Sequence, residues 1–552
     1  MVQALFAIAA ARIVPPVFVR HADKAGLFLP DFIWQRVTRP MSPHAIHSTD
    51  IIDSLAAICG ADNVLVDMES RALFAQDVYG QGKTPLAVVR PPTREAAAKA
   101  VAAAARAGVA IFPRGGGMSY TDAFLPTVEA AIMVDTGALD RIVNIDPRAL
   151  HATVESGCTW AKLDDELAVH GLRARFWGPF SGHDATVGGS LSNGTATFGS
   201  GISGTSGDNI LSVEVALADG RVIHTGMDAQ LGHDPFFSQY GPNLTGLFAN
   251  DAGALGLKLS ITLPLQPRAG HVEGVSAIFP DFDRMAAAME AVARQGLASE
   301  IFAMDPVVTA QFAGEPDLRT DLKMLLEIGK GPGGLKRMFR TVTGGRAFLK
   351  TPGFHAHFVV EGRDRLDALA KAAVVRHHLV GAREIPNSVP SAVRAVPFSP
   401  LPVTDPRGRR VLPIHGILPY AQAASLHAAV MAIVARHADE AEAASLVVGT
   451  SFFGIGNNAF LYEPVFYWPD ALSEYQARKT VSEMRYPAND LARALVERMR
   501  EQMVAAMFDH GAAHLQIGKK YPYLQDREAS LLRSIKAAID PNNLMNPGAL
   551  GL

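Results

Sequence analysis

Apolar positions recur along this chain with the two periods that are typical of helices and of strands. An Ala-rich stretch runs from residue 91 to residue 107 and is followed by Gly108. Thr93 is placed to cap its first turn, and Glu95 lies where the helix dipole favours an acidic side chain. We therefore predict a helix that begins after Thr93 and ends before Gly108. The apolar run Val109–Phe112 then predicts a short buried strand.

Further along, alternating apolar residues predict a strand over 211–223 that turns back at the hairpin signal Asp219-Gly220. Two more apolar runs, 354–360 and 460–467, also predict strands, and 497–509 predicts a helix. Strands, helices and glycine turns succeed one another up to about residue 267, where a first lobe is expected to end. Longer amphipathic helices follow, so the middle of the chain is expected to form a second, α+β domain.

A glycine turn, Arg114-Gly115-Gly116-Gly117-Met118-Ser119, follows the first predicted strand. Residues without Cβ allow close backbone approach, and the free N–H groups of such a turn suit phosphate oxygens. The spacing is neither that of a dinucleotide-binding crossover nor that of a nucleotide-hydrolysing phosphate loop. Taken alone, the turn could equally be an ordinary surface loop.

A second glycine-rich block favours a binding loop over an ordinary surface loop. It runs from Ser181 to Asn209 and contains Ala185-Thr186-Val187-Gly188-Gly189-Ser190. Two glycine loops, each bounded by predicted strands, indicate one extended ligand.

At this point the sequence resembles the flavoprotein oxidoreductases of the vanillyl-alcohol oxidase and p-cresol methylhydroxylase type. The resemblance extends from about Val78 to the C-terminus and rests on an ordered series of segments. They are, in chain order, 114–119, Val154-Glu155-Ser156-Gly157-Cys158-Thr159-Trp160, 185–190, Asp219-Gly220, Tyr240–Phe248 with Gly253–Gly256, and Ile539–Gly548.

The resemblance implies an α+β, two-domain flavoprotein with a discontinuous FAD-binding domain and an inserted substrate-cap domain. The expected parts are an N-terminal extension (1–50), the first part of the FAD-binding domain (51–268), the cap (269–500) and a return segment (501–552). The residues expected to bind FAD are Arg114, Gly115, Gly116, Gly117, Met118, Ser119, Thr186, Gly188, Gly189, Ser192, Asn193 and Ile223.

Covalent attachment of the flavin is not expected. Many relatives use a His two places after the glycine triplet, and this chain has Met118-Ser119 there. Bicovalent relatives also use a Cys where residues 176–184 carry none, and the linking His of vanillyl-alcohol oxidase corresponds to Asn457-Asn458-Ala459. FAD held without a covalent bond is therefore the prediction.

The resemblance also assigns candidate catalytic residues. Asp184 stands where relatives carry a carboxylate near flavin N5, and burial would raise its pKa into the range of a base. Its alternative role is to cap loop N–H groups. His514 is the second catalytic candidate, and Tyr521 and Tyr523 are substrate-binding candidates, although all three could be structural.

The function implied is oxidation of an alcohol, or of an activated C–H group in a small aromatic or allylic compound, by hydride transfer to N5. Phenol-oxidising relatives place a Tyr-Arg pair where this chain has Ala512-Ala513. Hydroxy-acid relatives hold a metal with a His-rich run where this chain has Phe452–Asn458, so no metal is expected. Two alternatives remain: an FAD-dependent 2-hydroxy-acid dehydrogenase, and a non-catalytic flavin-fold binding protein.

The composition of the chain argues against several classes of binding partner. The 552 residues carry a net charge of −3, and no basic cluster with aromatic residues suggests nucleic acid. The two cysteines argue against a disulfide framework, and no apolar run has the roughly 18 residues of a membrane span.

The N-terminus lacks the basic start of a secretory signal. We therefore expect a small-molecule substrate and a cytoplasmic location, with the periplasm as the alternative. The electron acceptor (oxygen, a cytochrome or a dye) and a homo-oligomeric state stay open.

Overall fold

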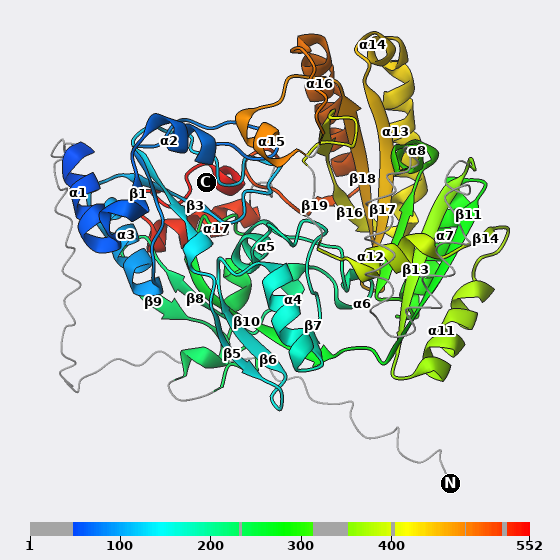
Figure 1. Ribbon diagram of the computed structural model, residues 1–552, viewed down its shortest axis with the longest axis horizontal. Helices are drawn as coiled ribbons and strands as arrows, with labels where there is room; N and C mark the ends of the chain where they lie inside the picture. Colours follow the sequence, from blue (N-terminus) through cyan, green and yellow to red (C-terminus); the bar gives the residue numbers. More distant parts are fainter. Residues whose placement is uncertain (1–47, 231–233, 313–350, 399–402, 481, 522–526) are drawn as a thin grey trace, which may run out of the picture. The chain divides into compact units, whose positions relative to one another are not determined.

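Three β-sheets organise the part of the chain that the structure describes (Figure 1). The structure is a computed structural model, and the described part is residues 48–552 without 231–233, 313–350, 399–402, 481 and 522–526. Helices and strands are intermixed throughout, so the predicted α+β class is confirmed. The expected N-terminal extension lies outside the described residues except for its last three positions.

The first sheet has four strands in the order β1-β2-β4-β3, of which β2, β4 and β3 run parallel. Helix α3 follows β2 and begins where the sequence predicts, because the Thr93 hydroxyl accepts from the Ala96 N–H at 3.1 Å. Its buried alanines pack with α1 and with this sheet in one apolar cluster. The elements are α1 (Ser48–Cys59), β1 (Val64–Leu65), α2 (Met68–Phe74), β2 (Ala87–Val89), α3 (Arg94–Arg106), β3 (Ala110–Arg114) and β4 (Ala131–Asp135).

The second sheet is antiparallel, in the order β5-β6-β10-β8-β9 with β7 beside β10. Strands β8 and β9 form the predicted hairpin, and its turn residue Gly220 has φ of 87°, a conformation that favours glycine. The elements are β5 (Ile142–Asp146), β6 (His151–Glu155), α4 (Trp160–Val169), β7 (Leu172–Ala174), α5 (Val187–Asn193), α6 (Ser200–Ser203), β8 (Ser212–Ala216), β9 (Val222–His224) and β10 (Leu257–Pro267).

The third sheet has nine described strands in the order β14-β11-β13-β12-β17-β18-β16-β19, with β15 also pairing with β18. We call it the cap sheet. Its strands are β11 (His271–Phe279), β12 (Glu300–Met304), β13 (Phe354–Gly362), β14 (Arg383–Ile385), β15 (Arg410–Pro413), β16 (Gly416–Pro419), β17 (Val447–Ile455), β18 (Ala459–Trp468) and β19 (Ala513–His514). The two strands predicted at 354–360 and 460–467 are thus confirmed as β13 and β18.

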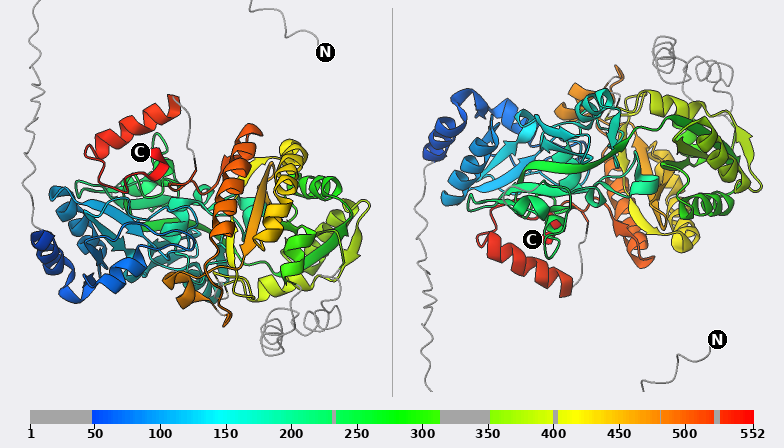
Figure 2. Two further views of the ribbon diagram at one scale, coloured as in Figure 1. Left: turned by 90° about the horizontal axis from the view of Figure 1, so that it is seen from above. Right: turned by 90° about the horizontal axis from the view of Figure 1, so that it is seen from below.

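Helices cover one face of the cap sheet (Figure 2). On β18, Phe460, Tyr462 and Phe466 point into the core that these helices form, so the alternate residues face the other way. The helices on that face are α7 (Phe282–Arg294), α11 (Arg365–His377), α13 (Ala423–Arg436), α14 (Ala438–Ala443) and α16 (Asp490–Asp509). The other described helices after residue 267 are α8 (Pro306–Phe312), α12 (Ser388–Ala395), α15 (Glu474–Lys479) and α17 (Arg527–Ile539).

The chain enters the cap sheet between Pro267 and His271 and leaves it after His514. Helix α16 continues to Asp509 and packs in the core of the cap sheet, so the return to the first lobe comes later than the expected residue 501. There the chain docks beside β3: the Ile111 N–H donates to Leu544 O, and the Asn546 N–H donates to Ile111 O, each at 2.8 Å. The red C-terminal segment and the blue strands accordingly lie side by side in Figure 1.

Candidate functional site

The two glycine loops pack directly against each other and form one surface. A Cβ atom on Gly116 would collide with the backbone of Asp184, and one on Gly115 would lie 2.5 Å from the Thr186 hydroxyl. Gly117 has φ of 75°, which side chains with a Cβ rarely adopt. The loops therefore need glycine in order to meet, and together they make a single concave surface that we call the cradle.

Backbone N–H groups of the first loop are free within the cradle. No described residue accepts a hydrogen bond from the N–H groups of Gly116, Gly117, Met118 or Ser119. The second loop differs, because the Gly188 N–H donates to Ser156 O at 2.9 Å and the Gly189 N–H to the Thr186 hydroxyl at 3.1 Å. Only the first loop thus has the run of free donors that suits phosphate oxygens, while the second loop shapes the wall.

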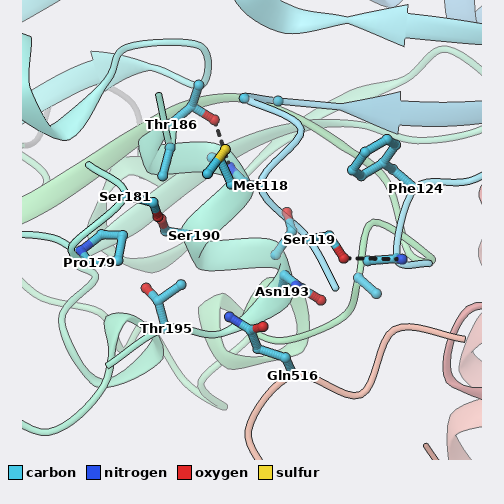
Figure 3. A pocket seen from close by; sticks show the side chains of 18 of the residues that line it. Met118, Ser119, Phe124, Pro179, Ser181, Thr186, Ser190, Asn193, Thr195 and Gln516 are labelled. Atoms are coloured by element: carbon cyan, nitrogen blue, oxygen red, sulfur yellow. Dashed lines mark hydrogen bonds between the residues drawn. The ribbon is translucent and has the colours of Figure 1, made fainter. Parts of the chain in front are cut away.

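A pocket extends from the cradle to the cap sheet. Figure 3 shows its side chains around the cradle, among them Met118, Thr186 and Asn193. It contains about 1350 Å³ of space free of protein atoms, part of it open to solvent. Three buried oxygen atoms that line it have no hydrogen-bond partner among the described residues: Ser156 Oγ, Asn193 Oδ1 and Thr195 Oγ1. Leaving such a group unpaired costs about 1–3 kcal/mol. Free N–H groups and orphaned oxygens along one pocket fit an extended, polar, phosphate-bearing ligand such as FAD.

Helix α15 crosses over the first glycine loop and holds it in place. The Tyr475 hydroxyl donates to Gly117 O at 3.0 Å, and the Gln476 amide donates to Val78 O at 2.8 Å. Lys479 Nζ forms an ion pair with the Asp184 carboxylate at 2.8 Å. The helix that follows β18 therefore contacts both glycine loops.

The cap sheet supplies one wall of the pocket. We call this the cap wall; its residues are Pro413, His415, Phe453, Leu461 and Glu463, next to Leu515 and Gln516 from the return segment. Burial raises the pKa of Glu463 to about 8. Burial, together with the neighbouring His514, lowers the pKa of His415 to about 4. Both side chains are therefore mainly uncharged at neutral pH.

Nearly all of the expected FAD-binding residues line this pocket; Ile223 does not. It lies on β9, at the edge of the second sheet, and packs partly buried against an apolar cluster.

The expected catalytic residues lie outside the lining. The Asp184 carboxylate is turned to Lys479. His514 sits behind the cap wall, where its Nδ1 bonds to His415 O at 3.1 Å and its ring stacks on Tyr521. Tyr521 is thus buried against His514 instead of facing the pocket, and Tyr523 lies outside the described residues.

Three residues that the sequence interpretation did not single out belong to the site: His415, Glu463 and Tyr475. Glu463 could have been noticed, because it is the one charged residue in the apolar run 459–468. His415 could not, since nothing local distinguishes it from the chain's other 17 histidines.

Within the described ranges, no group of three or more His, Cys, Asp or Glu side chains is placed to hold a metal ion. None of the described helices has the length and hydropathy needed to cross a membrane.

Comparison with known families gives two matches. Residues 85–226 match the model of the FAD binding domain, and residues 418–550 match that of the C-terminal domain of FAD linked oxidases. The first model spans both glycine loops, and the second spans most of the cap wall and the return segment.

Individual relatives are more distant. An uncharacterized FAD-linked oxidoreductase of Mycobacterium tuberculosis is 28% identical over 41% of this chain and 47% of its own length. The cytochrome D-lactate dehydrogenase 1 of Saccharomyces cerevisiae mitochondria is 30% identical over 38% of this chain and 35% of its own. The chain thus spans half or less of these relatives. The solved structure of p-cresol methylhydroxylase with substrate bound has the same fold, with a TM-score of 0.67 at 17% identity over 91% of this chain and 96% of that one.

Proposed function

Since the chain belongs to the FAD-linked oxidoreductases of the p-cresol methylhydroxylase and vanillyl-alcohol oxidase superfamily, we propose that it is an FAD-dependent oxidase or dehydrogenase of a small molecule. The observation that carries the proposal is the single pocket that joins the cradle to the cap wall. A site that only stored FAD would not need a second wall with titratable groups. A site that oxidises a substrate does, because the substrate must lie beside the cofactor.

The residues that would hold FAD are those of the cradle. The free N–H groups from Gly116 to Ser119 suit the pyrophosphate oxygens, and Asn193, Thr195 and Ser156 offer unpaired oxygen atoms to the rest of the molecule. Bound FAD supplies a two-electron acceptor for a hydride from the substrate carbon. The chain supplies apolar side chains, from Phe180, Phe453 and Leu515, that would limit the access of water to that carbon.

The substrate that these side chains fit best is a small aromatic or allylic alcohol, or a compound with an activated C–H group. Phe453 and Leu461 are paired on adjacent strands and present an apolar surface with an aromatic ring to the pocket. Such a surface favours a planar, weakly polar molecule.

A 2-hydroxy-acid substrate is the second candidate, and the similarity to a D-lactate dehydrogenase favours it. If it were correct with a metal in the site, chelators would abolish activity and added zinc or manganese would restore it.

Anaerobic mixing tests the proposal. The purified yellow protein is mixed without oxygen with aromatic alcohols, allylic alcohols, phenols and 2-hydroxy acids, and the visible flavin band is followed. The expected result is bleaching by at least one aromatic or allylic alcohol. A band that no compound bleaches, although dithionite does, would identify a flavin-fold binding protein instead.

Three further properties belong to the proposal. The electron acceptor is oxygen, a cytochrome or a dye-like molecule, and reoxidation of the bleached protein by each separates them. We place the protein in the cytoplasm, with the periplasm as the alternative. The domains are an FAD-binding part at 51–268, a cap at 269–500 and a return segment at 501–552, and expression trials should move the last limit beyond His514 so that helix α16 stays whole.

A further inference from the structure

Strand β18 sorts its side chains between the core and the pocket. Phe460, Tyr462 and Phe466 are buried in the core of the cap, while Leu461 and Glu463 line the pocket. This alternation is what a strand of period two dictates. Glu463 therefore faces the pocket because of its position on the strand.

His415 lies directly across from Glu463. It joins β15 to β16, and both strands pair with β18 in one continuous antiparallel register. Pro413 is opposite Val465, and Gly416 is opposite Tyr462. That register places His415 opposite Glu463, and Cβ atoms of such cross-strand pairs lie about 4.5–5.5 Å apart. Two titratable side chains thus enter the pocket from neighbouring strands at the same level.

The carboxyl group of Glu463 and one ring nitrogen of His415 have no partner among the described residues, although the His415 ring also bonds to the Gln516 side chain. Glu463 makes no hydrogen bond or ion pair with any described residue, and the only cause of its pKa shift is burial. His415 is 7% exposed, and its Nδ1 atom is buried without a partner. An unpaired buried nitrogen is costly, and a carboxyl group without a partner lies beside it, so the two groups at one point of a pocket indicate a polar ligand atom between them.

No described basic side chain pairs with Glu463 or His415. Tyr120, Tyr467 and His514 are the other titratable side chains that face them, and burial raises the pKa of both tyrosines. Arg114 and Lys258 are the basic residues among the described lining, and both belong to the first lobe. Lys258 is ion-paired with Asp251, and Arg114 lies near Asp135 and over Phe74. The cap wall thus offers no cation to a substrate carboxylate.

We propose that Glu463 is the base that takes the hydroxyl proton of an uncharged alcohol, and that His415 holds the hydroxyl oxygen. This inference rests on the proposed function. The O–H bond of the alcohol breaks and its proton goes to the carboxylate of Glu463. The C–H bond breaks and its electron pair leaves with hydrogen as a hydride to FAD, the named two-electron acceptor. The C–O bond becomes a carbonyl, and Glu463 later returns its proton to solvent.

Glu463 and His415 together also favour an uncharged alcohol over a 2-hydroxy acid as the substrate. An uncharged alcohol needs only the two groups already present. A 2-hydroxy acid would bring a carboxylate into an apolar wall with no cation, and above pH 8 it would meet an ionised Glu463. The preference for the uncharged alcohol therefore grows as pH rises.

Glu463→Gln is the direct test, with the exposed Glu166→Gln as the matched control. The rate of flavin bleaching by the best aromatic alcohol should fall by roughly 10²–10⁴-fold in Glu463→Gln and stay unchanged in Glu166→Gln. In the wild type that rate should rise with pH through about 8, and Glu463→Gln should lose this rise. Glu463→Asp should recover part of the rate. FAD affinity, measured by titrating the flavin-free protein, should be the same in all four proteins, and His415→Asn should weaken alcohol binding.

A second experiment compares the rates at which benzyl alcohol and mandelate, its 2-hydroxy-acid counterpart, bleach the flavin. The wild type should prefer benzyl alcohol by at least about tenfold, more so at pH 9 than at pH 7, and Glu463→Gln should lose that pH dependence. Equal bleaching rates in wild type and Glu463→Gln, or a preference for mandelate, would overturn the inference while leaving the oxidoreductase assignment intact. If no compound bleaches the flavin band of the wild type, the proposed function is contradicted, and this inference with it.

Discussion

The Tyr475 hydroxyl donates a hydrogen bond to the carbonyl oxygen of Gly117 at 3.0 Å and so joins helix α15 to the glycine cradle. The two residues are far apart in the sequence, and the bond is buried. Because Gly117 lies in a left-handed conformation among the free N–H groups, this contact helps to keep those groups in place.

Replacing Tyr475 by Phe should weaken FAD binding without unfolding the protein. A net hydrogen bond contributes about 0.5–1.5 kcal/mol, so the dissociation constant should rise about 2- to 12-fold. Titration of the flavin-free protein with FAD measures it. Tyr486→Phe is the control, because its exposed hydroxyl bonds to Arg407 O away from the cradle. Equal affinities of the two variants would show that α15 does not support the cradle.

A methyl group at Gly116 should separate the two glycine loops. In Gly116→Ala the Cβ atom collides with the backbone of Asp184, so we expect loss of most bound FAD and a lower melting temperature. Gly246→Ala is the matched control, since its nearest neighbour would lie 3.9 Å away. Full flavin content in purified Gly116→Ala would mean that the loops need not touch.

Asp184 should matter for the cradle more than for chemistry. Asp184→Asn removes the ion pair with Lys479, so FAD should dissociate faster, whereas bleaching of the flavin that stays bound should proceed at nearly the wild-type rate. Stopped-flow reduction of the flavin-saturated variant measures this. A loss of 10²-fold or more in the reduction rate, roughly the share of a general base, would restore Asp184 as the catalytic carboxylate.

A buried ion-pair network should make stability fall in acid. Burial alone would raise the pKa of Glu361, but Arg394 and then Arg173 outweigh it and lower the pKa to about 2. The stabilisation by Glu361 is therefore complete above about pH 4.5 and is lost as pH falls toward 2. Glu361→Gln should be destabilised at pH 7, by about 3–5 kcal/mol if the arginines are left unpaired. The gap to wild type should narrow below pH 4 in urea unfolding, and a gap that is constant from pH 7 to pH 3 would contradict the assignment.

The sequence predicted elements whose signals are local. Thr93 caps α3 and Asp219-Gly220 turns the β8–β9 hairpin because each signal acts within a few residues. The two glycine loops could be recognised for the same reason, and both line the pocket. That they touch each other could not be predicted, because the collision partner of Gly116 is a backbone atom of Asp184 in another segment.

The surroundings of the catalytic candidates could not be predicted from the sequence. Asp184 and His514 were chosen by position in a motif, but ion pairing with Lys479 and stacking on Tyr521 depend on tertiary contacts. The opposition of His415 and Glu463 depends on the register between strands about 50 residues apart, which one-strand periodicity cannot give.

The central claim is that the cradle holds FAD, and the cofactor content of the purified protein tests it most directly. The protein should be yellow, and acid precipitation should leave a colourless pellet and release close to one FAD per chain into the supernatant, because Met118 and Ser119 offer no group for attachment. Chromatography of the supernatant against FAD and FMN standards identifies the nucleotide. A colourless protein that does not bind added FAD, or one that releases FMN, would contradict the claim; a yellow pellet would contradict the absence of a covalent bond.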